Sequence, residues 1–176
     1  MGDALQVIVT ASNSTASASA SSAPTSLVQA LAPTNVSLPV VSGIARDGQT
    51  LSTTNGTWSA APAATYTYQW QRCDASGSSC ANIVGANGIS YAISDSDIDH
   101  TIRAQITASN SQYVGGTETA VQSVPTAVVQ ATPPTNIGAP SISGTVAPGN
   151  TVTANVGSWT AAPTPTYTYQ WQDCNT

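Results

Sequence analysis

The sequence predicts an all-β protein built as an antiparallel sandwich, with one complete unit between two partial ones. Three observations predict it. A segment of 43 residues that begins at Pro33 recurs from Pro134 with an offset of 101, and 21 of its positions are identical. Apolar and polar residues alternate with a period of two, which is the pattern of a half-buried strand. Turn-forming residues separate these runs at intervals of about 8–12 residues, which is the spacing of strands in a sandwich.

The repeat also places the domain boundaries. Outside the long repeated segment, residues 9–14 match residues 106–111. We therefore expect residues 1–31 to be the C-terminal part of one unit, residues 32–131 to be one complete unit, and residues 132–176 to be the N-terminal part of another. The chain as given would then begin and end inside units.

Alternation places the individual strands. In residues 66–71 the aromatic side chains share one face, and Thr67, Gln69 and Gln71 share the other. Residues 102–108 alternate in the same way. Within the complete unit, strands are expected near 39–44, 49–55, 65–73, 80–84, 89–94, 101–109 and 117–129.

The motifs GxTL, GxW, TYTYQWQRCD and IRAQITASNS, in this order, resemble those of the immunoglobulin-like repeats found in tandem in large bacterial cell-surface and secreted proteins. The resemblance implies an immunoglobulin-like, or fibronectin type III-like, sandwich. Ala104 stands where antibody domains carry Cys, so no disulfide between the sheets is expected. Asp99 stands where such repeats carry Gly and is expected in a tight turn. The core is then expected to rest on Trp58, Trp70, Leu51, Ile93, Ile102 and Ile106.

The cysteines predict one disulfide. Cys73 and Cys80 flank a turn of six residues and are expected to bond across a hairpin in an oxidising compartment. The metal-site alternative would need two more soft ligands, which the sequence does not place nearby. Cys174 is the repeat equivalent of Cys73 and is expected to be a free thiol or to pair between molecules.

Acidic residues before the strand at 101–109 offer two weaker motifs. Asp95, Asp97 and Asp99 form a D-x-D-x-D pattern, but Gly is missing at the sixth position of this calcium-like loop, and Ile106 stands where a bidentate Glu belongs. We expect a polar turn in which Asp97 caps backbone amides. His100 beside Asp99 lacks a nucleophile motif and is expected to be a surface-turn residue. No catalytic residue, metal site or cofactor is therefore expected.

The composition narrows the classes of partner. The 176 residues include no Lys, three Arg and eight Asp or Glu, for a net charge of -5. Nucleic acids and anionic membrane surfaces need many cationic contacts, so neither is an expected partner. The sequence has no run of about 18 apolar residues, so insertion in a membrane is not expected. The missing Lys also excludes P-loop NTPases and Schiff-base enzymes. Together with the close Cys pair, this composition favours an extracellular or cell-surface protein.

These features predict a non-enzymatic structural protein whose partial units complement each other between copies of the chain, head to tail, in a filament. Each partial unit alone would leave an apolar face and unpaired strand edges in water. Residues 76–100 have no counterpart in either partial unit, so the rebuilt unit would lack its middle strands. The contact candidates are Leu5, Val7 and Val9 at one end and Trp159, Tyr169 and Trp171 at the other.

The alternative prediction is an adhesin or carbohydrate-binding spacer fragment of a larger bacterial surface protein. Aromatic rings stack on sugars, and the candidates for a face that binds cell-surface glycans are Tyr66, Tyr113, Tyr167, Gln69 and Gln71. Packing and decoration of the sheet is the simpler role for the same side chains.

Overall fold

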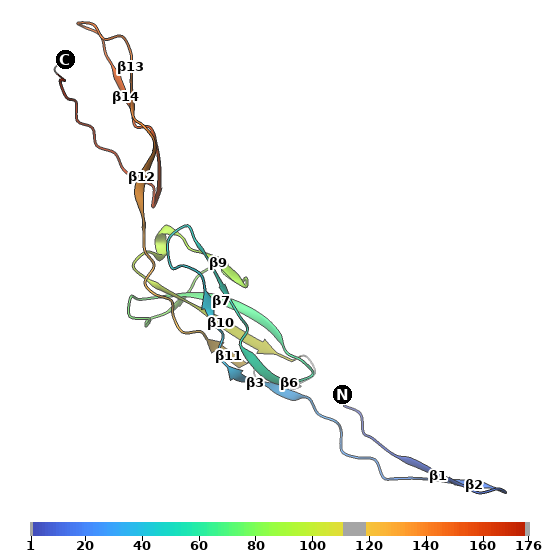
Figure 1. Ribbon diagram of the computed structural model, residues 1–176. Coiled ribbons are helices and arrows are strands. Elements are labelled where there is room, and N and C mark those ends of the chain that lie inside the picture. The colour runs from blue at the N-terminus through green and yellow to red at the C-terminus, as the bar shows by residue number, and fades with distance from the viewer. Residues whose placement is uncertain (1, 111–118, 175–176) are drawn as a thin grey trace.

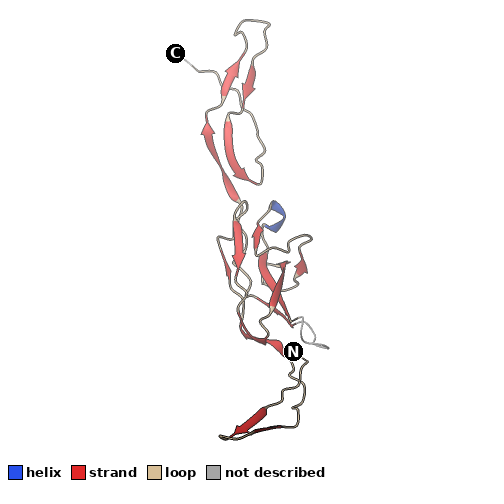
Figure 2. Cartoon of the chain, turned by 90° about the vertical axis from the view of Figure 1, so that its right-hand side faces the viewer, coloured by secondary structure: helices blue, strands red, loops and turns tan. Residues whose placement is uncertain are grey.

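The computed structural model describes residues 2–110 and 119–174, and in it the chain is long and narrow. A thicker central body lies between two slender segments that leave it at opposite poles (Figure 1 and Figure 2). Strands dominate the described residues, and the only helix among them is the short 3-10 turn η1 (Asp95–Asp97). The sheets are antiparallel and none of the described ones closes into a barrel. The all-β prediction is confirmed.

The central body has three antiparallel sheets. The largest has the strand order β11-β10-β7-β8, the second β4-β5-β9, and the third is the pair β3-β6. This layered arrangement is consistent with a β-sandwich. The bounds are β3 (Leu31–Ser37), β4 (Val41–Ser42), β5 (Thr50–Thr53), β6 (Thr57–Ala61), β7 (Thr65–Cys73), β8 (Ala81–Asn82), β9 (Ser90–Ala92), β10 (Thr101–Ser109) and β11 (Thr119–Gln122).

Expected and observed strands agree best where alternation is longest. The predictions for 65–73 and 101–109 coincide with β7 and β10. The expected strand at 117–129 is wrong in length, because β11 ends at Gln122; residues 117–118 lie outside the described part. Beyond Gln122 the chain follows β10 through side-chain as well as backbone bonds, and Ser123 and Thr126 accept amide protons from β10 through their hydroxyl groups.

Two strands were not predicted at all. β3 contains Pro33 and Asn35, residue types that are depleted in strands, and β6 is short. They pair nevertheless, with register shifts in the ladder between Leu31 and Thr34 and again between Asn35 and Ser37. Asn35 stabilises this irregular pair by donating from its side chain to the carbonyl oxygens of Ser37 and Thr57, at 2.8 and 3.2 Å.

The core forms where β7 and β10 pair. Ala104 lies opposite Trp70 in the register, and both are fully buried. The indole Nε1 donates to the Gly88 carbonyl oxygen at 2.9 Å, and the ring stacks on Tyr91 with centroids 5.7 Å apart. Trp58 is half-buried and packs on the edge of the core. The other predicted core residues that are buried are Leu51, Ile93, Ile102 and Ile106.

The slender segments consist of two-stranded pairs. The N-terminal segment holds the hairpin β1 (Ile8–Ser12) and β2 (Ser17–Ser21). The C-terminal segment holds the pairs β12-β15 and β13-β14. Their bounds are β12 (Thr132–Gly138), β13 (Ser141–Ser143), β14 (Thr153–Asn155) and β15 (Ser158–Ala162).

Truncation of the central tryptophan tests this assignment of the core. Trp70→Ala removes a fully buried side chain and should lower the free energy of unfolding by about 3–5 kcal/mol. The measurement is denaturant unfolding followed by circular dichroism. The matched control is Trp171→Ala, which changes the same motif where the indole is 51% exposed and should cost about 0.5 kcal/mol or less in the monomer. Equal losses in the two variants would contradict the assigned core.

Candidate functional site: the two open ends

The expected disulfide is present, and it joins two residues that are only seven positions apart. Cys73 at the end of β7 is bonded to Cys80, and their Cα atoms lie 3.9 Å apart. The turn between them is ordered by Asp74, whose Oδ1 accepts from the amides of Ser76 and Ser78 and from the Ser76 hydroxyl. The bond from this hydroxyl is the main reason that the pKa of Asp74 is lowered. Cys174 is an exposed free thiol.

Asp97 caps a backbone amide, as expected, and also anchors two strands. The Ser94 amide donates to its Oδ2 at 2.9 Å. The Tyr91 hydroxyl donates to the same oxygen at 2.6 Å, and Arg72 Nε lies 2.7 Å from Oδ1. Burial alone would raise the pKa of Asp97, but the bonds from Tyr91, Ser94 and Arg72 outweigh it and the pKa is lowered. The partnership with Arg72, 25 residues away in sequence, was not predicted.

The remaining motif residues of this turn are Asp99 and His100. Among the described residues, no group of three or more His, Cys, Asp or Glu side chains is placed to hold a metal ion. Asp99 has a φ of 64°, so it occupies the left-handed turn expected of it. His100 is half-buried, and its Nδ1 lies 2.9 Å from the carbonyl oxygen of Ile98.

The predicted glycan-binding face is not assembled as expected. Gln71 was expected to be exposed, but it is buried beneath a polar network: Arg103 Nε donates to its Oε1 at 2.7 Å, and its own Nε2 donates to Asn82 at 2.8 Å. Gln69 is half-buried, and its side-chain amide donates to the carbonyl oxygens of Trp70 and Ile83. Tyr66 is half-buried against Trp58, with ring centroids 6.1 Å apart. Tyr113 lies outside the described residues, and Tyr167 is exposed on the C-terminal segment.

The N-terminal hairpin repeats the hydrogen bonds of β10 and the chain that follows β11. Beyond the β1-β2 ladder, amides of residues 22, 25 and 28 donate to carbonyl oxygens of residues 7, 5 and 3. In the central body, amides of residues 123, 126 and 129 donate to carbonyl oxygens of residues 104, 102 and 100. Side chains follow the same plan, since Thr25 accepts from the Leu5 amide as Thr126 accepts from the Ile102 amide, both at 3.0 Å.

The same hairpin lacks the covering that the central body provides. Leu5, Val7 and Val9 are the counterparts of Ile102, Ala104 and Ile106. The central residues are 0% exposed, whereas the three N-terminal ones are 62%, 58% and 62% exposed. These apolar side chains therefore lie on β1 and on the hydrogen-bonded chain before it, and they remain largely exposed.

The C-terminal segment repeats the opposite half of the central body. β12 and β15 pair with Asn136 opposite Trp159, as β3 and β6 pair with Asn35 opposite Trp58. The indole Nε1 of Trp159 donates to the carbonyl oxygen three residues before it at 2.8 Å, as that of Trp58 does at 2.7 Å. Residues 166–174 match the sequence of β7 except that Asp173 replaces Arg72, but no described strand pairs with them.

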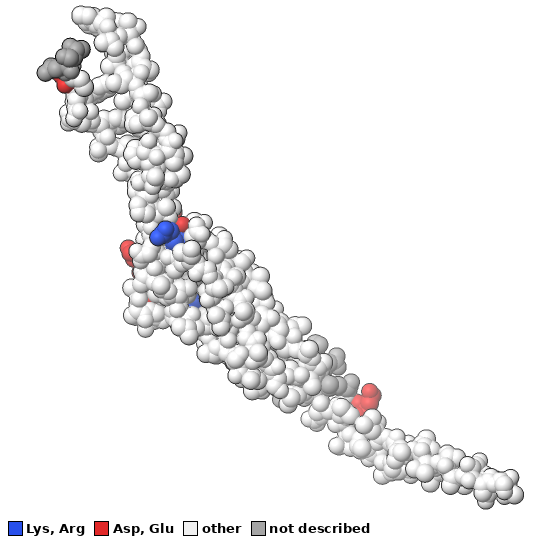
Figure 3. Space-filling view, in the orientation of Figure 1, with Lys and Arg blue, Asp and Glu red and all other residues white. Residues whose placement is uncertain are grey.

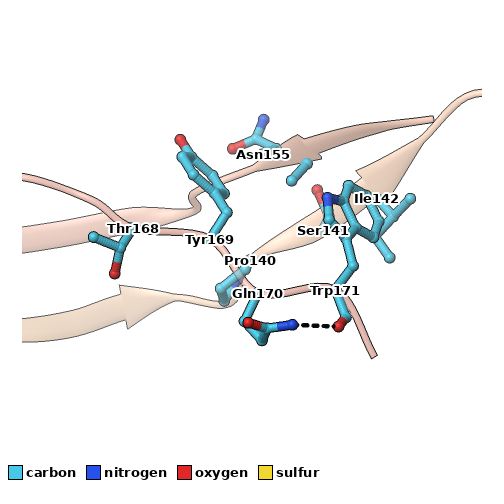
Figure 4. A pocket seen from close by; sticks show the side chains of 9 residues that line it. Pro140, Ser141, Ile142, Asn155, Thr168, Tyr169, Gln170 and Trp171 are labelled. Atoms are coloured by element: carbon cyan, nitrogen blue, oxygen red, sulfur yellow. Dashed lines mark hydrogen bonds between the residues drawn. The ribbon is translucent and has the colours of Figure 1, made fainter. Parts of the chain in front are cut away.

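The C-terminal segment has an open hollow. It has a volume of about 630 Å³ and lies between the β13-β14 pair and the unpaired run that ends the chain. Tyr169 and Trp171 face Ile142 and Asn155 across it (Figure 4). Tyr169 is 60% exposed and Trp171 is 51% exposed, although the counterpart of Trp171 is the fully buried Trp70.

Charge is nearly absent from both ends. Asp3 is the only charged side chain in residues 1–31, and Asp173 is the only one in residues 132–176. Most charged atoms instead gather on the central body, near the pole from which the C-terminal segment leaves (Figure 3). Contacts made by the ends would therefore rest on apolar burial and on backbone hydrogen bonds, with little electrostatic steering.

Comparison with protein-family models, with curated proteins and with solved structures found no match to this chain. No helix in the described part of the chain has the length and hydropathy needed to cross a membrane.

The thiols give a direct test of the disulfide assignment. Cys174 should be the only cysteine that reacts with a maleimide in the native protein, because Cys73 and Cys80 are bonded. Mass spectrometry without reductant should find one label per chain, and Cys174→Ser should take none. Two or three labels on the native protein would contradict the assignment.

The Asp97 anchor predicts a dependence of stability on pH. Because folding lowers its pKa from 3.8, Asp97 stabilises the native state fully above this value, and the contribution is lost as the pH falls through the lower native pKa. Asp97→Asn should lower the free energy of unfolding by about 3–5 kcal/mol at pH 6, and by less as the pH falls below about 4. Asp3→Asn, at an exposed carboxyl, should follow the wild-type curve. A loss in Asp97→Asn that is the same at every pH would contradict the ionic role.

Proposed function

We propose that this protein is a non-enzymatic structural component of the cell exterior, built from immunoglobulin-like units, whose open ends complete each other between copies of the chain. The observation that carries the proposal is the N-terminal hairpin. It already has the hydrogen bonds of the second half of a unit, while its apolar face stays exposed.

The immunoglobulin-like assignment is supported by the central body. The central body has a four-stranded and a three-stranded antiparallel sheet beside the β3-β6 pair, and β7, one of the two inner strands of the larger sheet, carries a buried tryptophan, as strand C of an immunoglobulin-like sandwich does. Ala104, which replaces the cysteine of antibody domains, is fully buried opposite Trp70. The core therefore rests on apolar packing, with the Cys73–Cys80 bond confined to a hairpin.

The pairing of β7 with β10 supplies a template for the contact between copies. In the central body these strands pair from Thr101 opposite Cys73 to Ser109 opposite Thr65. The C-terminal end carries the counterpart of β7, and the N-terminal end carries the counterpart of β10. Transfer of the register places Val7 opposite Trp171 and Val9 opposite Tyr169, at the hollow of the C-terminal segment. The hairpin of one copy would then complete the core of the next.

The shape of the molecule favours pairing between copies over pairing within one. The two ends leave the central body at opposite poles, so that they do not meet in a single chain (Figure 1). A contact between two different surfaces, repeated from copy to copy, extends into a filament unless its rotation closes a ring. Addition of a strand from a neighbour is a known mode of recognition, in which backbone bonds supply affinity and side-chain pockets supply register.

The rebuilt junction would be a weaker copy of the central unit. It has no counterpart of β8, β9 or η1, so Trp171 would lack the stacking partner that Tyr91 gives Trp70. The junction also has no counterpart of Asp97, which pairs with Arg72 in the central body. Because Asp173 replaces Arg72 at the C-terminal end, the junction holds no arginine that would need this carboxylate. Assembly should accordingly be reversible and dependent on concentration. Placement outside the cell is supported by the disulfide, which persists in oxidising compartments.

The test compares substitutions of two neighbouring residues, Val7 just before β1 and Ile8 at its start. Val7→Asp places a charge on the face that would cover Trp171 and should abolish association. Ile8→Asp is the matched control, because Ile8 corresponds to Gln105 on the opposite face and should leave association intact. Sedimentation velocity over a range of concentrations, with negative-stain microscopy, measures both. Deletion of residues 1–31 should also leave a monomer.

A wild-type chain that stays monomeric at every concentration would overturn the head-to-tail proposal. So would filaments that persist in Val7→Asp or after the deletion. The alternative prediction, a spacer of a larger surface protein, would then take precedence.

A further inference from the structure

Apolar contacts alone would leave the register of the head-to-tail junction open. Aromatic side chains occur at every second position of residues 167–171, and Leu5, Val7 and Val9 follow the same period at the N-terminal end. A shift of two residues along a strand keeps every side chain on its own face, so an aromatic stripe would still meet an aliphatic one. A contact of another kind must therefore select one register.

In the central body Asn110 supplies such a contact. It directly follows β10, and its Nδ2 donates to the carbonyl oxygens of Pro62 at 2.8 Å and Leu31 at 3.3 Å. Leu31 begins β3, and Pro62 directly follows β6. A donor that reaches two fixed carbonyl oxygens fits one position along the strand, because a shift of two residues moves it by about 7 Å.

The C-terminal segment keeps the acceptor side of this contact. Thr132 is the counterpart of Leu31. Pro163 is likewise the counterpart of Pro62. The β12-β15 ladder repeats the pairing of β3 with β6 at this point, including the register shift that follows Thr132. Both acceptors are backbone oxygens, so the change from leucine to threonine leaves them in place.

The N-terminal hairpin keeps the donor side. Asn13 is the counterpart of Asn110, since they directly follow the matching strands β1 and β10. Its Oδ1 accepts from the Thr15 amide at 2.9 Å, from the Thr15 hydroxyl at 2.8 Å and from the Ala16 amide at 2.9 Å. These bonds orient the side chain, whereas its Nδ2 has no acceptor among the residues that the structure describes. The donor is therefore ordered before a partner binds.

Few other side-chain bonds between the two matching parts of the central body, residues 31–75 and 99–130, carry over to the junction. Thr101 and Thr119 donate from their hydroxyl groups to carbonyl oxygens of the first part. Their counterparts, Ala4 and Ala18, have no hydroxyl. The bonds whose counterparts still have polar side chains on both strands are those of Thr65 with Ser109 and of Gln71 with Arg103. Those two join β7 to β10, so among the described residues only the Asn13 contact would reach the β12-β15 pair.

On the basis of the head-to-tail pairing proposed above, we propose that the carbonyl oxygens of Thr132 and Pro163 are the docking site for the Asn13 amide of the next copy, and that this contact fixes the register of the junction. A junction shifted by two residues carries the amide away from both oxygens and leaves polar groups without partners, which costs free energy. The contact also gives specificity for a second copy of this chain, because an apolar strand without a donor at this position does not match.

The first test removes the donor and keeps the turn. Asn13→Asp retains an oxygen that can accept from Thr15 and Ala16, but a second acceptor replaces Nδ2. In sedimentation velocity on the full chain it should weaken association about tenfold or more, because a carboxylate would face two carbonyl oxygens. The matched control is Ser19→Asp, which adds the same charge where the counterpart is the exposed Ala120, and it should associate as the wild type does.

The second test measures the register by disulfide cross-linking. In the central body Thr101 lies opposite Cys73, so the proposed register places Ala4 of one copy opposite Cys174 of the next. With a mild oxidant, Ala4→Cys should cross-link to Cys174, whereas Gln6→Cys, which reports a shift of two residues, should not. Cys174→Ser in the Ala4→Cys chain should abolish the cross-link.

The two tests combine to separate the contact from the pairing itself. Adding Asn13→Asp to the cysteine variants, at concentrations where the chains still associate, should remove the preference for position 4 over position 6. Asn13→Asp chains that associate and cross-link as the wild type does would overturn the docking contact and leave head-to-tail pairing intact. Equal cross-linking at both positions in chains that keep Asn13 would overturn the single register. A wild type that stays monomeric at every concentration would overturn the pairing and this contact with it.

Discussion

The pairing of β7 with β10 is the interaction on which the rest of the structure depends. It places Trp70 opposite Ala104, and the small side chain leaves room for the indole to reach Gly88 and to stack on Tyr91. No disulfide joins the sheets, so this packing must order the sandwich without a covalent link between its layers. The Cys73–Cys80 bond, in contrast, closes only a short loop and restrains little of the unfolded chain.

The described residues of the two ends have no equivalent of this pairing. Each end keeps its local hydrogen bonds, because hairpins and neighbouring strands satisfy them within a short stretch of chain. Neither end has the partner that β7 and β10 provide for each other. Trp171 and Val7 are exposed, although their sequence surroundings resemble those of the buried Trp70 and Ala104.

Charged side chains are few, and several of those in the central body form hydrogen bonds between residues distant in sequence. Arg72, Tyr91 and Asp97 join β7, β9 and η1 in one buried cluster, where the hydrogen bonds to the carboxylate outweigh the cost of its burial. Asp47 is the converse case, because its Oδ2 is buried without a hydrogen-bond partner among the described residues. Burial is the main reason that the pKa of this carboxyl is raised.

Sequence patterns alone determined the strands that alternate longest, the disulfide, the buried Trp70 and the likeness of the two ends to the central body, because these follow from short-range periodicity and from the repeat. They did not reveal β3 and β6, since Pro33 and irregular pairing hide the strand pattern. They also placed Gln71 on an exposed face. Only the tertiary structure decided that Gln71 is buried with Arg103 and Asn82 as its hydrogen-bond partners, and that Arg72 meets Asp97. Those contacts join residues distant in sequence, and no local pattern encodes which distant side chains the fold brings together.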